Sequence, residues 1–243
     1  MTAAPTTTSV VEQDPTLRGG MIARAAQVAG FLLAQAVILF LGAGRLDWMW
    51  AWTYLAICLA SVCVNAVLML RTCPDLIAER GRPGQSTQDW DKVIAGIWAL
   101  IAFLVLPIVA AFDVRWGWTG GVSTAWHVAG AVALGCGLAL GSWAIVSNRY
   151  FSTAVRIQRD RGQTVCRTGP YRIVRHPGYV GFTLQTVATP VVLGSLWALL
   201  PAATVAVLMI VRTVLEDRLL HAELPGYVEY ARDVRYRLLP GVW

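Results

Sequence analysis

Charge is scarce in this sequence, and lysine is almost absent. Charged residues make up 14% of the 243 residues and hydrophobic residues 56%, with a mean hydropathy of +0.56. A soluble domain of this length carries more charge and less apolar surface, so the composition excludes that class. Of the 20 basic residues only Lys92 is a lysine, and this preference for arginine is typical of a GC-rich bacterial genome.

The sequence also lacks the motifs of metal sites, nucleotide loops and common hydrolases. Its five cysteines are scattered and form no CxxC pair, so we expect neither a metal site nor a disulfide framework. No HExxH, GxSxG or phosphate-loop pattern occurs. Residues 1–20 are polar and threonine-rich and lack the apolar core of a signal peptide, which predicts a polar N-terminal tail and no cleaved leader.

What the chain has instead is a series of long apolar runs. Six of them follow one another: 21–43, 49–70, 93–112, 125–147, 178–193 and 196–216. Each of the first four is long enough to cross about 30 Å of hydrocarbon, whereas the last two predict a shorter helical hairpin. Gly137 and Gly141, four residues apart, predict a close helix–helix contact. We therefore predict an all-α, polytopic transmembrane helix bundle, with four transmembrane helices over residues 21–147 and a connector, the hairpin and a C-terminal tail over residues 148–243.

The basic residues predict the orientation of the bundle. Eighteen of them fall on one side of the predicted membrane, in the segments 1–24 (2), 71–92 (4), 148–176 (7) and 212–243 (5). The opposite side keeps only Arg45 and Arg115. Positive charge marks the cytoplasmic side, so we expect a multi-pass protein of the cell membrane, the inner membrane in a bacterium, with both termini in the cytoplasm. The net charge of +6 needs no nucleic-acid partner, because this topology and contact with anionic membrane lipids account for it.

Two polar islands flank the predicted hairpin. The first is the run GPYRIVRHPGYVG over residues 169–181, and the second holds Arg212 and Glu216. Seventeen residue steps lead from Pro177 to Gly194 at the turn, and 17 more lead from Ser195 to Arg212. Two helical arms that rise about 1.5 Å per residue therefore bring the islands to one depth. Charge gathered at helix ends in a membrane predicts a functional site, here at the cytoplasmic face.

Each island has a physical reason to bind a ligand. Pro177 suits the first turn of a helix, and the backbone amides of residues 178–180 would then be free to bind a carboxylate or a phosphate at the positive end of the helix dipole. Arg212 and Glu216 lie four residues apart on one helix face. The alternative for this pair is an interfacial ion pair that only stabilises the fold.

From Asn148 to the C-terminus the sequence resembles the isoprenylcysteine carboxyl methyltransferase family, whose wider group includes phospholipid N-methyltransferases. Three motifs carry the resemblance in order: the GPYxxxRHPxYxG run over 169–181, an RxxxE(E/D) element over 212–217, and an LxGYxxY-like tail, here LPGYVEY, over 224–230. The resemblance implies methyl transfer from S-adenosylmethionine, bound in a cytoplasmic cofactor pocket, to a lipophilic acceptor that enters from the bilayer.

The resemblance also implies roles for individual residues. Arg212 and Glu216 match the family's pair beside the reacting centre and are expected to be catalytic. The residues expected to bind the cofactor are Gln163, Thr164, Val165, Cys166, Tyr171, His176, Pro177, Gly178 and Tyr179. The family more often has His-x-Leu-Val where this chain has residues 163–166, so only backbone contacts would persist there. The roles of Gln158 and His221 stay open, as does the oligomeric state.

The chemistry of the acceptor decides what the catalytic pair does. A carboxylate is ionised at neutral pH and needs no base, so Arg212 would hold it in a two-point grip while Glu216 orients Arg212 or the cofactor. An amine must lose a proton, which would make Glu216 or His176 the base. Neither scheme requires a metal ion. We rank carboxyl methylation of an isoprenylcysteine-like or other lipidic acceptor first and phospholipid N-methylation second. A membrane reductase of the sterol-reductase type and a non-catalytic membrane protein are the remaining alternatives.

Overall fold

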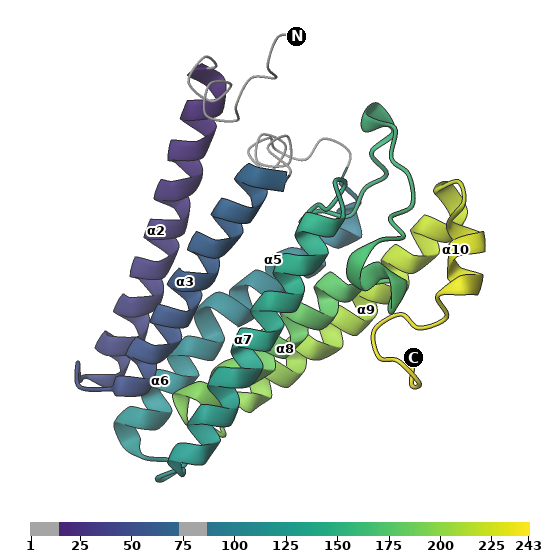
Figure 1. Ribbon diagram of the computed structural model, residues 1–243. Coiled ribbons are helices and arrows are strands. Elements are labelled where there is room, and N and C mark those ends of the chain that lie inside the picture. The colour runs from purple at the N-terminus through teal and green to yellow at the C-terminus, as the bar shows by residue number, and fades with distance from the viewer. Residues whose placement is uncertain (1–14, 73–86) are drawn as a thin grey trace.

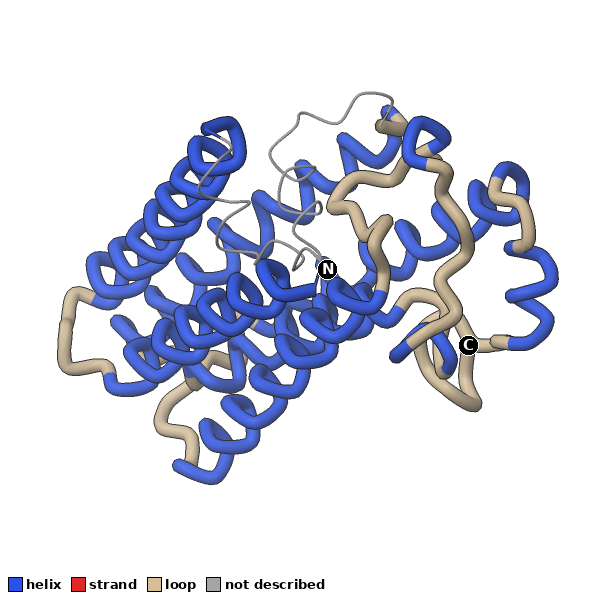
Figure 2. Tube along the Cα trace, turned by 45° about the horizontal axis from the view of Figure 1, so that its top comes forward, coloured by secondary structure: helices blue, strands red, loops and turns tan. Residues whose placement is uncertain are grey.

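The computed structural model of the protein describes residues 15–72 and 87–243, and this part of the chain consists of helices joined by turns and loops (Figure 1; Figure 2). The helices are α2 (Pro15–Ala43), α3 (Met49–Thr72), α5 (Asp89–Leu100), α6 (Leu106–Trp116), α7 (Thr124–Ser147), α8 (Pro177–Leu193), α9 (Leu199–Glu223) and α10 (Tyr227–Asp233). A π-helical turn, η1 (Ile101–Val105), joins α5 to α6. Two 3₁₀ turns, η2 (Arg159–Arg161) and η3 (Gly169–Arg172), lie in the connection between α7 and α8.

Among residues 15–72 and 87–243, five helical segments are long and apolar enough to cross a membrane. They lie in α2, α3, α7, α9 and the continuous stretch Asp89–Trp116 that α5, η1 and α6 form together. The prediction of a polytopic helical bundle is therefore confirmed. The fifth apolar run forms α8, which has 17 residues and is the short arm of the hairpin. Its partner α9 is not short: it has 25 residues and continues to Glu223, because its polar residues find partners and do not stop the helix.

A glycine turn closes the α8–α9 hairpin. Gly194 caps the helix α8, and its φ of +77° lies in the left-handed region that favours glycine. The Ser195 N–H then bonds to the Pro190 carbonyl at 2.9 Å. The Ser195 hydroxyl donates to the carboxylate of Asp113 at 2.5 Å, and that carboxylate also accepts the N–H of Thr119 at 2.7 Å. Asp113 is buried, at 1% exposed, and through these two hydrogen bonds it ties the loop after α6 to the tip of the hairpin.

Small residues let α8 pack directly against α7. A Cβ on Gly181 would lie 2.7 Å from the backbone nitrogen of Gly141 and 2.8 Å from the Gly137 carbonyl oxygen. Any side chain larger than hydrogen at Gly181 would therefore push the two backbones apart. The predicted close contact of Gly137 and Gly141 is confirmed, and its partner is the helix that begins at Pro177.

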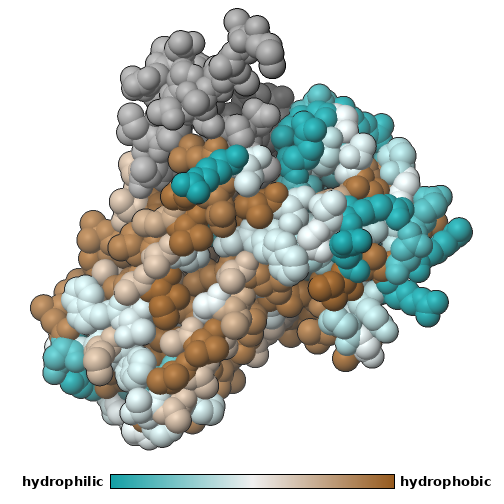
Figure 3. Space-filling model, in the orientation of Figure 1, coloured by the Kyte–Doolittle hydropathy of each residue, from teal (hydrophilic) through white to brown (hydrophobic). Residues whose placement is uncertain are grey.

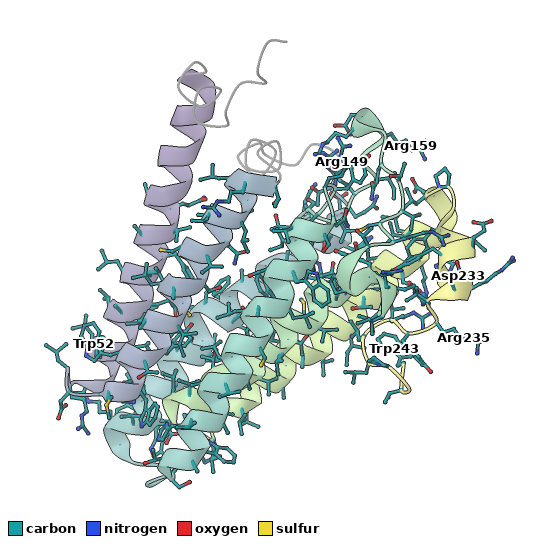
Figure 4. All side chains as sticks on the ribbon, viewed as in Figure 1. Trp52, Arg149, Arg159, Asp233, Arg235 and Trp243 are labelled. Carbon is teal, nitrogen blue, oxygen red and sulfur yellow. The ribbon has the colours of Figure 1, made fainter. Side chains whose placement is uncertain are left out.

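The polar loops gather at one end of the bundle, opposite the tip of the hairpin. The connection 148–176 lies there beside α10 (Figure 1). Hydrophilic residues cover this end, whereas the visible helix shafts are mostly hydrophobic (Figure 3). Arg149, Arg159 and Asp233 lie at the polar end, and Trp52 lies at the other end (Figure 4). The polar end is thus the end at which α8 begins, where the first island was predicted.

Candidate functional site

The α8–α9 hairpin brings the two predicted islands into contact. The guanidinium of Arg212 lies over the ring of Tyr179, with its central carbon 5.2 Å from the ring centre. The Tyr179 hydroxyl donates to the carboxylate of Glu216, one turn further along α9. His176 stacks on the Tyr179 ring, with 5.7 Å between the ring centres and 5° between their planes. The predicted meeting of the start of α8 with Arg212 is confirmed.

Arg212 is paired, but not with Glu216. Its Nε and Nη2 atoms donate to the two carboxylate oxygens of Asp91 at 2.7 and 3.1 Å, and Nη2 also donates to the Thr153 carbonyl at 2.7 Å. Arg212 is 5% exposed and Asp91 is 1% exposed. The expected two-point grip on an acceptor is therefore not available in this geometry, because Asp91 occupies the edge of the guanidinium that would make it. Asp91 lies 121 positions earlier in the chain, and no motif marked it in the sequence.

A polar cavity opens beside Tyr179. The connection between α7 and α8, the start of α8, the end of α9 and α10 form its wall, and it holds about 810 Å³ of empty space including its open mouth. Predicted site residues in this wall are Gln163, Thr164, Val165, Cys166, Tyr171, His176, Gly178, Tyr179 and Glu216. Pro177 and Arg212 are buried outside the wall. Gln158, whose role the sequence left open, is buried in it.

One stretch of the wall has backbone groups available for a ligand. None of the N–H groups of residues 164–166, which line the cavity, donates to a carbonyl within the described parts of the chain. Side chains hold the stretch in place instead: Cys166 and Thr168 both donate to the Ser147 carbonyl at 3.2 Å. Backbone amides need a partner in protein or solvent, so a ligand can satisfy them here. This arrangement fits the expectation that residues 163–166 bind through their backbone.

The start of α8 lacks most of the free amides that the sequence predicted. The N–H groups of Tyr179 and Val180 both bond to the His176 carbonyl, at 3.1 and 3.3 Å. His176 precedes the helix with a φ of −124° and a ψ of 59°, which turns its carbonyl toward the first turn. The predicted anion site at residues 178–180 is therefore wrong for two of its three amides.

Asp217 is the centre of a buried network that positions His176. Its carboxylate accepts hydrogen bonds from Arg175 at 2.9 and 3.2 Å, from Tyr227 at 2.9 Å and from Arg237 at 2.8 Å, and the His176 Nε2 atom lies 3.3 Å away. The backbone N–H of His176 donates to the Arg237 carbonyl at 3.0 Å, so the C-terminal tail also holds this residue. A buried carboxylate needs such partners. The acidic last position of the RxxxE(E/D) element was the one sequence signal for it.

Three buried tyrosines stand in the cavity wall. Burial raises the pKa of Tyr171, Tyr227 and Tyr230 above the ordinary tyrosine value, and the Asp217 carboxylate contributes to the shift at Tyr227. Their hydroxyls therefore stay neutral at physiological pH, and that of Tyr230 donates to the Tyr171 carbonyl at 2.7 Å. Over residues 15–72 and 87–243, no group of three or more His, Cys, Asp or Glu side chains is arranged to hold a metal ion.

Comparison with known proteins agrees with the motifs. Residues 131–222 match the model of the isoprenylcysteine carboxyl methyltransferase (ICMT) family. The matched residues include the runs at 169–181 and 212–217, whereas the tail at 224–230 lies outside the match. Similar curated proteins are protein-S-isoprenylcysteine O-methyltransferase B of Arabidopsis thaliana and the probable protein-S-isoprenylcysteine O-methyltransferases of Oryza sativa subspecies indica and japonica. Each is 30% identical over 97 residues, which cover 37% of this chain. The chain spans about half the length of these relatives, 47% of the first and 48% of the other two.

Proposed function

Residues 131–222 belong to the isoprenylcysteine carboxyl methyltransferase family, and on this premise we propose that the protein is an integral membrane methyltransferase that uses S-adenosylmethionine. Its acceptor is a lipophilic molecule that reaches the site from the bilayer, with an isoprenylcysteine-like or other lipidic carboxylate as the first candidate. The polar end of the bundle, which carries the site, faces the cytoplasm together with both termini.

One observation carries this proposal: segments that are separate in the sequence meet in a single cavity. Gln163 comes from the connection after α7, His176 precedes α8, and Glu216 lies on α9, yet all three stand in the same wall. These are the segments that the family resemblance assigns to the cofactor and to the reacting centre. A stabilising ion pair at a membrane interface would not require a shared cavity.

The chemistry of the wall suits the parts of S-adenosylmethionine. The backbone amides of residues 164–166, which donate to no carbonyl in the described part of the chain, can bond to an adenine edge or to a carboxylate. Glu216 accepts from the Tyr179 hydroxyl and forms no ion pair within the described chain, so its carboxylate is available to a cationic group. Tyr171 adds an aromatic ring that attracts a cation, whereas the ring of Tyr179 already carries the Arg212 guanidinium. When bound, the cofactor supplies a methyl group on a cationic sulfonium.

The residues of the chain would then act mainly by positioning the acceptor. A carboxylate acceptor is ionised at neutral pH, so no base is needed. The positive charge of Arg212 lies over Tyr179 and can attract this carboxylate, although its Nε and Nη2 atoms are already bonded to Asp91. Orientation in a site that excludes water is the principal source of acceleration for such a reaction.

Calorimetric titration of the purified protein with S-adenosylhomocysteine tests the cofactor site. We expect His176→Ala to weaken binding by about 1 to 3 kcal/mol, as for the loss of a buried hydrogen bond. His221→Ala is the matched control. The Nδ1 atom of His221 lies 2.7 Å from the backbone carbonyl oxygen of Asp217, yet His221 lies outside the cavity wall. Folded wild-type protein that binds no S-adenosylhomocysteine would refute the proposal. Equal affinities of the two variants would remove His176 from the site.

A second candidate, N-methylation of an aminophospholipid, is favoured by the state of Glu216. Asp91 forms the ion pair with Arg212, and Glu216 forms no ion pair with a basic side chain in the described chain. Such a group can accept the proton that an amine must lose. A labelled-methyl screen over lipid extracts, repeated with Glu216→Gln, separates the two. With a carboxylate acceptor the variant is slower at every pH, whereas with an amine acceptor its activity recovers only as the pH rises.

A further inference from the structure

Asp91 contacts the reaction centre although it lies outside the family match and outside the cavity wall. It stands in the first turn of α5 and is 1% exposed. Its Oδ1 accepts from Arg212 Nε at 2.7 Å, and its Oδ2 accepts from Arg212 Nη2 at 3.1 Å and from the backbone N–H of Val155 at 2.7 Å. One carboxylate thus holds two different segments of the site.

The second of these segments belongs to the cavity wall. Val155 lines the cavity, and its carbonyl accepts the N–H of Gln88, just before α5, at 3.2 Å. Two residues earlier, the Thr153 carbonyl accepts from Arg212 at 2.7 Å. The segment 153–155, which contributes Ala154 and Val155 to the wall, is therefore attached to α5, to the residue before it and to α9 by three hydrogen bonds. Two of these bonds depend on Asp91 or on the guanidinium that it orients.

We propose that Asp91 is a positioning residue for methyl transfer, which sets both the orientation of the Arg212 guanidinium and the place of the cavity wall at residues 153–155. With Nε and Nη2 held, Nη1 is the nitrogen of Arg212 that has no partner in the described chain. The acceptor can then receive a hydrogen bond from Nη1 alone, and the position of this nitrogen is tied to the cavity wall. This inference rests on the proposed function and names a residue that acts through Arg212.

A buried carboxylate can also be purely structural, and the chain contains a matched control for that role. Asp113 lies in the same membrane span as Asp91 and is likewise 1% exposed. It accepts hydrogen bonds from Thr119 and Ser195 at the opposite end of the bundle. Asp113→Asn therefore removes a buried charge without touching the site.

The first experiment compares Asp91→Asn with Asp113→Asn in the full chain, by S-adenosylhomocysteine titration and by methyl transfer at saturating cofactor. We expect Asp91→Asn to lower kcat at least about tenfold and to weaken cofactor binding at least about threefold. Asp113→Asn should lower the thermal midpoint and leave both quantities within about twofold of wild type. The same kcat and affinity in the two variants would overturn the proposal.

A second variant covers the case in which Asp91→Asn does not fold, since it leaves the Arg212 charge buried without a partner. The double variant Asp91→Asn with Arg212→Gln removes both charges. The Asp91→Asn substitution keeps a side-chain oxygen that can accept the Val155 N–H, so if the charge of Asp91 acts through Arg212, this double variant transfers methyl groups at the rate of Arg212→Gln alone. A further drop of tenfold or more in the double variant would overturn the inference and leave the proposed function standing. Wild-type protein that binds no S-adenosylhomocysteine would overturn both.

Discussion

Replacement of Gly181 by alanine tests whether the contact between α7 and α8 sets the geometry of the site. The new Cβ would lie 2.7 Å from the Gly141 nitrogen, and ordinary contact for a Cβ begins at 3.4 Å, so the backbones must separate by about 0.7 Å. The opposing atoms are helix backbone, including the Gly137 carbonyl, and cannot rotate away. Overpacking of this kind costs about 1 to 3 kcal/mol.

The displacement should reach the site, because Gly181 lies two residues after Tyr179 on a helix of only 17 residues. A misplacement on the order of 1 Å can lower a rate about 100-fold, so we expect methyl transfer to fall at least tenfold together with the thermal midpoint. Gly135→Ala is the matched control on α7, since no atom lies within 4 Å of its new Cβ. It should keep full activity and a midpoint equal to or above that of wild type. Thermal unfolding in detergent and labelled-methyl transfer give both values, and a Gly181→Ala protein that equals Gly135→Ala in both would refute this prediction.

Three further predictions concern the ion pair of Arg212 with Asp91, the buried Tyr227 of α10 and the membrane topology. Arg212→Lys keeps the charge but not the two-point contact with Asp91, so methyl transfer should slow at least about tenfold, or roughly 1.4 kcal/mol; unchanged turnover would make the pair merely structural. Burial raises the pKa of Tyr227 in the folded protein. The stability that its neutral hydroxyl contributes is therefore present below the pKa of tyrosine in the unfolded chain, about 10, and is lost as the pH rises beyond it. Tyr227→Phe should flatten the fall of the thermal midpoint above about pH 10, and identical curves for both proteins would contradict this. Cysteines introduced at Trp118 and Arg161 should differ in labelling, with only position 161 accessible from the cytoplasm; cytoplasmic labelling of position 118 would show that the span count is wrong.

The sequence by itself determined the features that depend on local composition. Apolar runs become helices in a membrane because their backbone groups must be bonded within the segment, so the all-α bundle followed from run lengths. The helical rise is constant, so equal arms of 17 residues were enough to bring Arg212 to the start of α8. Motif resemblance supplied residues 163–166 and His176, which the structure then places in one wall.

Only the tertiary structure decided which polar groups pair. Spacing along α9 favours Glu216 as the partner of Arg212, yet Asp91, 121 positions away, takes the guanidinium because both of its oxygens meet the same edge. Asp217 gains its partners from three separate segments in the same way. A buried charge must be compensated by whatever lies nearest in space, and distance in space is not written in sequence spacing. The amides at the start of α8 depended likewise on the backbone conformation of His176, which composition does not set.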